Sequence, residues 1–116
     1  MSKDNRVLIS EILESIEKIE RYVAGATYDS FVRDDEGQDA VIRRLAIIGE
    51  AVRNIPDELR QKYPAVPWQK ITGMRNILIH EYSDVDIKRV WETAKNELPG
   101  LKSEILVIGK AMGLLP

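Results

Sequence analysis

The 116-residue sequence contains no cysteine, and His80 is its only histidine. The lack of cysteine excludes disulfides, thiolate zinc sites, iron–sulfur clusters and cysteine nucleophiles. A single histidine also prevents one chain from binding a metal through a pair of histidines. We therefore predict a cytoplasmic protein of a reducing compartment whose chemistry, if any, does not rest on a cysteine-bound metal, and we expect no cofactor.

Long apolar runs are missing as well. The longest strongly apolar run covers residues 105–109, whereas a membrane helix needs about 20 apolar residues. The apolar run at residues 7–9 is too short for the core of a signal peptide. With 44% hydrophobic and 31% charged residues, the sequence predicts a single globular domain over residues 1–116 that does not associate with membranes.

Charge is distributed unevenly along the chain. Residues 1–39 carry five basic and ten acidic side chains, whereas residues 40–75 carry seven basic and three acidic ones. The overall net charge of −2 argues against tight nonspecific binding to duplex nucleic acid, which normally requires a basic excess. Arg43, Arg44 and Arg53 in the basic segment are either solvated or ion-paired, or they extend a path for an RNA backbone.

Apolar residues recur every three or four positions along most of the chain, which predicts an all-α fold. We expect an up-and-down bundle of four main helices with short helical turns. The four main helices are predicted over residues 6–24, 38–55, 68–79 and 87–112, and the short turns over 27–35 and 57–62. Pro99 is expected to kink or split the last helix.

The segment 73–82 combines side chains suited to chemistry, namely Arg75, Asn76, His80 and Tyr82. Asn76 and His80 are four residues apart and share one face of a helix. Arg75 and His80 lie about 140° apart around an ideal helix, so cooperation between them requires a helix end or a second chain. The alternative is structural, with His80 at a helix C-terminus and Arg75 in a surface ion pair.

The run Arg75-Asn76-x-x-x-His80-x-Tyr82 resembles the R-x4-H-x-Y signature of HEPN-domain proteins, and specifically of their HepT-like toxin branch. The resemblance extends over most of the chain, because further blocks occur in the expected order. These blocks are residues 40–45, 48–51, 63–64, 67–68, 73–76, 90–91 and 98–99.

The resemblance implies a homodimer in which two R-x4-H motifs face each other, and a metal-independent endoribonuclease toxin. It further implies a type VII-like toxin–antitoxin pair, in which a small nucleotidyltransferase antitoxin adds AMP to the motif tyrosine. That tyrosine is Tyr82 in this sequence.

The residue types suit metal-free RNA cleavage, which needs a base, an acid and positive charge on the phosphate. His80 can act as base or acid near neutral pH, and Arg75 can bind two phosphate oxygens. Asn76 can orient the imidazole or donate to the phosphate. A symmetric dimer brings in the second histidine that two proton transfers need. Tyr82 either binds phosphate or a base, or packs at a helix end.

Three further residues have a predicted role with an alternative. Glu50 interrupts an apolar stretch beside Gly49 and either holds the Arg75 guanidinium or is a surface glutamate. Trp68 and Trp91 are predicted to anchor the core or a dimer interface rather than to stack on bases.

The alternative to a ribonuclease toxin is a non-catalytic helical module that docks a nucleotidyltransferase or a nucleotide.

Overall fold

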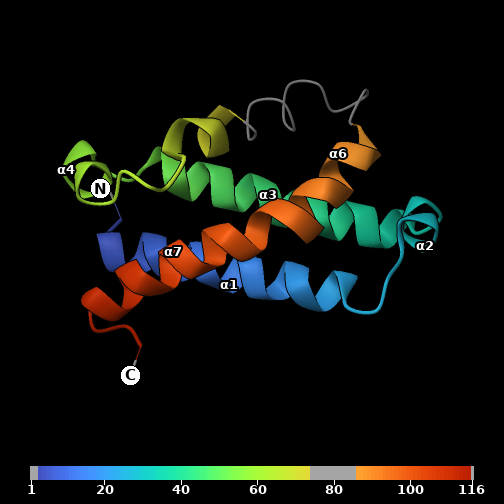
Figure 1. The fold of residues 1–116 in the computed structure, drawn as a ribbon, viewed down its shortest axis with the longest axis horizontal. Helices are drawn as coiled ribbons and strands as arrows, with labels where there is room; N and C mark the ends of the chain where they lie inside the picture. Colours follow the sequence, from blue (N-terminus) through green and yellow to red (C-terminus); the bar gives the residue numbers. More distant parts are fainter. Residues whose placement is uncertain (1–2, 74–85, 116) are drawn as a thin grey trace.

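The computed structural model describes residues 3–73 and 86–115, so Arg75, Asn76, His80 and Tyr82 lie outside the described residues. These ranges contain helices and no strand, which confirms the predicted all-α fold (Figure 1). Between α4 and α6, residues 68–73 are helical. The elements are α1 (Asn5–Val23), α2 (Tyr28–Val32), α3 (Asp35–Arg53), α4 (Asp57–Lys62), α6 (Ile87–Glu92), the π-helical turn η2 (Thr93–Glu97) and α7 (Leu98–Ala111).

Local sequence signals explain where α1 begins and ends. The Asp4 carboxylate accepts a hydrogen bond of 2.7 Å from the backbone N–H of Arg6, which caps the helix start. Gly25 follows the helix with φ +74°, a conformation that glycine adopts without a steric penalty. The observed bounds therefore differ by one residue at each end from the predicted range 6–24.

The core lies where α1 packs against α3 and α7 (Figure 1). One face of each of these helices is apolar, and its side chains are almost completely buried. No helix in the described ranges has the length and apolarity to cross a membrane. The largest fully buried side chains are Leu8, Ile9, Ile12, Ile16, Ile19, Val41, Leu45, Ile48, Val52, Leu98, Ile105 and Ile108.

The short helix α2 is attached to the bundle by aromatic packing. Thr27 and Ser30 form a reciprocal capping box at its start. Phe31 is buried, and its ring centroid lies 5.2 Å from that of Trp91 on α6. Tyr28 lies 6.3 Å from the same indole. Trp91 is half-buried and packs on the core, as predicted for a structural tryptophan.

The connection from α3 to residues 68–73 is fixed by side chains that bind backbone carbonyls. Arg60 on α4 donates to the carbonyls of Val52 and Ile55 at 2.8 and 3.0 Å, which satisfies oxygens at the end of α3. The Trp68 indole N–H donates to the Tyr63 carbonyl at 3.0 Å, and the ring is buried. These bonds hold the connection in place and so position residues 68–73, whose Trp68 and Ile71 side chains pack in the core.

The last part of the chain is one continuous helical run from α6 through η2 to α7 (Figure 1). Inside it, the Leu98 N–H bonds to the Thr93 carbonyl five residues earlier, which is the π-helical pattern. Pro99 has no N–H to give to the carbonyl four residues before it. The structure therefore shows no split of the helix at Pro99: a π turn precedes the proline, and the helical run continues without a break.

Candidate functional site

Glu50 is the one predicted site residue that the structure describes. It lies near the end of α3 with a side chain that is 48% exposed, and its Oε2 is 4.0 Å from Nη1 of Arg53. Its predicted partner Arg75 lies outside the described residues, as do Asn76, His80 and Tyr82. The pairing of Glu50 with Arg75 therefore stays a prediction.

The three arginines of the basic segment have different surroundings. Arg53 is exposed and ion-paired with Glu50, in line with one of the two predicted interpretations. Arg43 is exposed, whereas Arg44 is half-buried. A role of these side chains along an RNA path stays a prediction.

A cavity of about 380 Å³ lies between α1 and α3, and we call it the α1–α3 cavity. Arg44 and Glu50 line it from α3, and Ser15 lines it from α1. The Ser15 hydroxyl is buried and has no hydrogen-bond partner among the described residues. In these same residues, no group of three or more carboxylates or imidazoles is placed to hold a metal ion.

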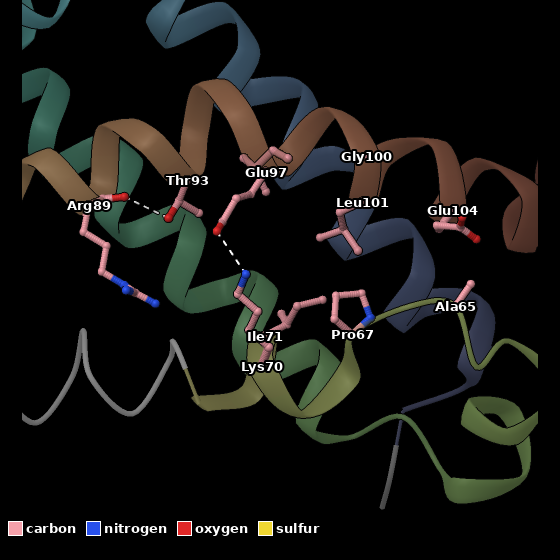
Figure 2. Close-up of a pocket in the computed structure, with 11 residues that line it drawn as sticks. Ala65, Pro67, Lys70, Ile71, Arg89, Thr93, Glu97, Gly100, Leu101 and Glu104 are labelled. Atoms are coloured by element: carbon pink, nitrogen blue, oxygen red, sulfur yellow. Dashed lines mark hydrogen bonds and ion pairs between the residues drawn. The ribbon is translucent and has the colours of Figure 1, made fainter.

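A second cavity, the α7 cavity, has a volume of about 400 Å³ and lies between residues 65–71 and the α6–η2–α7 run (Figure 2). This volume falls in the range typical of small-molecule sites. Its walls combine apolar side chains with two cations and two carboxylates. The lining residues are Ala65, Pro67, Lys70, Ile71, Arg89, Thr93, Glu97, Leu98, Gly100, Leu101 and Glu104.

An ion pair joins the two walls of the α7 cavity. Lys70 Nζ lies 3.1 Å from Oε1 of Glu97, and both side chains are about half exposed (Figure 2). The buried Thr93 donates its hydroxyl hydrogen to the Arg89 carbonyl at 2.8 Å, which satisfies both groups inside the helix. Figure 2 shows Arg89 at one end of the cavity and Glu104 at the other.

Sequence reasoning missed this cavity, although a signal for it exists. Lys70 precedes Arg75 by five residues, and Arg89 follows His80 by nine. Asp86 caps α6 by accepting hydrogen bonds from the backbone N–H groups of Lys88 and Arg89. The cations of the α7 cavity therefore flank the motif segment on both sides along the chain.

Comparison with known proteins places this helical chain in a family. Residues 12–108 match the family described as "Ribonuclease HepT-like". The chain therefore belongs to the HepT-like ribonuclease family, as the motif resemblance predicted. No solved structure matches the chain significantly.

Two relatives illustrate the range of the match. A protein of Methanocaldococcus jannaschii named "Gamma-glutamylcyclotransferase and putative RNase" is 49% identical over 108 residues, which is 93% of this chain and 49% of the relative. The chain thus spans about half the length of that protein. The "Probable ribonuclease HepT" of Thermococcus cleftensis is 38% identical over 104 residues, covering 90% of this chain and 94% of the relative.

Proposed function

We propose that this chain is a metal-independent endoribonuclease and the toxin of a type VII-like toxin–antitoxin pair. The observation that carries the proposal is the complete R-x4-H-x-Y motif, Arg75 to Tyr82, within a chain that matches the ribonuclease family over residues 12–108. Two relatives whose names include RNase or ribonuclease support the same class of reaction.

In the proposed reaction, His80 of one protomer takes the proton from a ribose 2′-hydroxyl. The 2′-oxygen then attacks phosphorus, the bond from phosphorus to the 5′-oxygen breaks, and the leaving oxygen gains a proton. The products are a 2′,3′-cyclic phosphate and a free 5′-hydroxyl. Arg75 binds the phosphate oxygens, whose negative charge is redistributed in the transition state.

One histidine in each chain cannot act as base and acid at the same time in a single turnover. We therefore propose a homodimer in which the partner's His80 protonates the leaving 5′-oxygen. Asn76 orients an imidazole or donates to the phosphate, and Glu50 holds the Arg75 guanidinium in place. Glu50 lies near the end of α3 with a side chain that is 48% exposed.

Tyr82 is the proposed site of control. A nucleotidyltransferase antitoxin transfers AMP from ATP to the tyrosine hydroxyl and releases pyrophosphate. The new phosphodiester carries a negative charge that competes with substrate for Arg75, and the adenosine adds bulk beside His80. Both effects oppose RNA binding, so the modified protein does not cleave RNA.

The decisive experiment incubates purified protein with RNA in EDTA and compares wild type with His80→Ala and Arg75→Ala. Wild type is expected to produce fragments with 2′,3′-cyclic phosphate ends, and each variant is expected to lose most of this activity. Circular dichroism of the variants checks that the helices are retained. Cleavage that persists in His80→Ala, or that requires added Mg²⁺ or Mn²⁺, would contradict the proposed mechanism.

A further inference from the structure

The α7 cavity has two chemically different ends. Arg89 lies at one end with the Lys70–Glu97 ion pair beside it, and the carboxylate of Glu104 lies at the other end (Figure 2). The two cations and the Glu97 carboxylate together leave one positive charge at the first end. Between the ion pair and Glu104 the wall is apolar and includes Ile71 and Leu101. A nucleotide has the same order of groups, because an anionic phosphate is joined through a sugar to a flat base with hydrogen-bonding edges.

The π turn is a separate feature that points to this wall as a functional one. π-helical turns are rare and are found frequently at functional sites. Here η2 supplies Thr93 and Glu97 to the cavity, while α6 and α7 supply Arg89 and Glu104. The extra residue of the π turn sets how far the α6 side chains are rotated relative to those of α7. It therefore determines that Arg89 and Glu104 both line one cavity.

We propose that the α7 cavity binds one nucleotide of the RNA substrate, next to the phosphodiester that the motif cleaves; this inference rests on the proposed function. Arg89 and Lys70 bind a backbone phosphate, since arginine and lysine are the usual phosphate ligands. The base lies against the apolar wall with its edge toward Glu104. Single-stranded RNA is commonly bound in this way, with a base unstacked into a protein pocket.

The location in the chain supports a subsite close to the reaction. The motif segment begins just after Lys70 and Ile71 and ends just before α6, which carries Arg89. Lys70 is also held across the cavity by Glu97, so its ammonium group is kept near the cavity wall. A phosphate bound there displaces part of this ion pair, which is exposed and therefore weak.

Glu104 gives the subsite a preference among bases. A carboxylate accepts hydrogen bonds, and the exocyclic amino groups of adenine, cytosine and guanine can donate them. Uracil has no amino group, and carbonyl oxygens lie on both sides of its N3–H, where they repel a carboxylate. We therefore expect the subsite to disfavour uridine and to accept cytidine.

Three variants test the cavity by independent routes. Arg89→Gln removes the phosphate ligand, and Glu104→Gln replaces the acceptor by an amide that can also donate. Gly100→Leu fills the cavity, because a Cβ at Gly100 meets no atom within 4 Å, and leucine favours a helix more than glycine does. The matched controls are Arg33→Gln and Ser103→Leu, which change exposed residues outside the cavity lining.

The first measurement is kcat/KM for short oligoribonucleotides that carry cytidine or uridine beside the cleaved bond, with His80→Ala as the inactive reference. Arg89→Gln and Gly100→Leu are expected to lower kcat/KM by about tenfold or more, mainly through KM. Glu104→Gln is expected to reduce the discrimination between cytidine and uridine. Both controls are expected to match wild type.

The second measurement detects binding without cleavage. Amide NMR spectra of wild type and Gly100→Leu are recorded during titration with 5′-CMP and with 5′-UMP. CMP is expected to shift the amides of Thr93 and Leu101 at lower concentration than UMP does, and Gly100→Leu is expected to abolish these shifts.

The outcomes separate this inference from the proposed function. If wild type cuts RNA in a His80-dependent way while Arg89→Gln and Gly100→Leu behave like the controls, the cavity is not a substrate subsite. If wild type does not cut RNA, the proposed function is wrong, and the CMP titration alone decides the inference. A Gly100→Leu variant that changes the oligomeric state but retains the CMP shifts would assign the cavity to a second copy of the chain and overturn the inference.

Discussion

Lys102 on α7 and Glu20 on α1 form an ion pair, with 2.8 Å between Nζ and Oε1, although they are 82 residues apart in sequence. The bond joins the C-terminal helix to the first helix at the edge of the core. The hydrogen bond to Glu20 is the largest cause that raises the pKa of Lys102 above its ordinary value of 10.5. The charges of Glu20 and Glu17 act in the same direction, and burial opposes them.

This ion pair predicts a specific pH dependence of stability. Folding raises the pKa of Lys102. The contribution of the ion pair to the free energy of unfolding is therefore fully present below pH 10.5 and is lost as the pH rises through the raised pKa. Lys102→Gln is expected to lower the free energy of unfolding by at most about 1 kcal/mol at neutral pH, since both side chains are partly exposed. Urea titrations of both proteins should converge once the pH has passed the raised pKa of Lys102, whereas Lys110→Gln should match wild type throughout. A difference that grows at high pH would contradict this account.

The buried face of α3 predicts a large effect from a single truncation. Ile48 is 0% exposed, whereas Val107 on α7 is 57% exposed. Ile48→Ala is expected to destabilise the fold by about 2–5 kcal/mol, because it removes buried apolar contacts and leaves a cavity. Val107→Ala is expected to change stability by less than about 0.5 kcal/mol. Equal losses in urea unfolding would show that Val107 is covered in solution.

The shortage of histidine predicts a dimer. Light scattering at micromolar concentration is expected to give twice the mass of the 116-residue chain. An interface able to hold at that concentration buries at least about 1,000 Å². A mass of one chain over the whole concentration range, in a protein that still cleaves RNA, would exclude the partner's His80 as the acid.

The proposed control by AMP predicts a single modified tyrosine. After co-expression with the nucleotidyltransferase, intact-protein mass spectrometry is expected to show AMP on wild type and none on Tyr82→Phe. Tyr22→Phe is the matched control, since Tyr22 is 41% exposed on α1 and should leave the modification intact. Equal modification of wild type and Tyr82→Phe would place the target on another residue.

The parts of the fold that sequence predicted are those with local causes. The range 57–62 of α4 is predicted and observed with the same bounds, because Pro56 separates it from α3. α3 begins at Asp35, three residues before its predicted start at residue 38, because Asp34 caps it by accepting a 2.9 Å bond from the Gly37 N–H. The Asp34 cap is also a local sequence signal. The predicted start rests on the apolar pattern, however, and that pattern begins further along the chain.

The parts that sequence could not predict depend on distant segments. Nothing near Arg60 in sequence indicates that its guanidinium binds carbonyls at the end of α3. The π turn leaves the apolar spacing almost unchanged, so periodicity alone does not reveal it. The α7 cavity requires Lys70 and Glu97 to meet across the fold. The motif residues, by contrast, were identified from spacing and resemblance, and their geometry stays a prediction.

The π turn also limits which changes in chain length this family member tolerates in its last helical run. A π turn contains one residue more than the α-helical turn it replaces. Deleting one residue between Thr93 and Glu97 would remove this extra residue and restore the α-helical pattern, so α6 and α7 would keep their relative orientation. Arg89 and the core residue Val90 would then keep their present positions. Deleting one residue from the regular α-helical part of α7 would instead turn everything before it by about 100° and misalign α6 with the bundle.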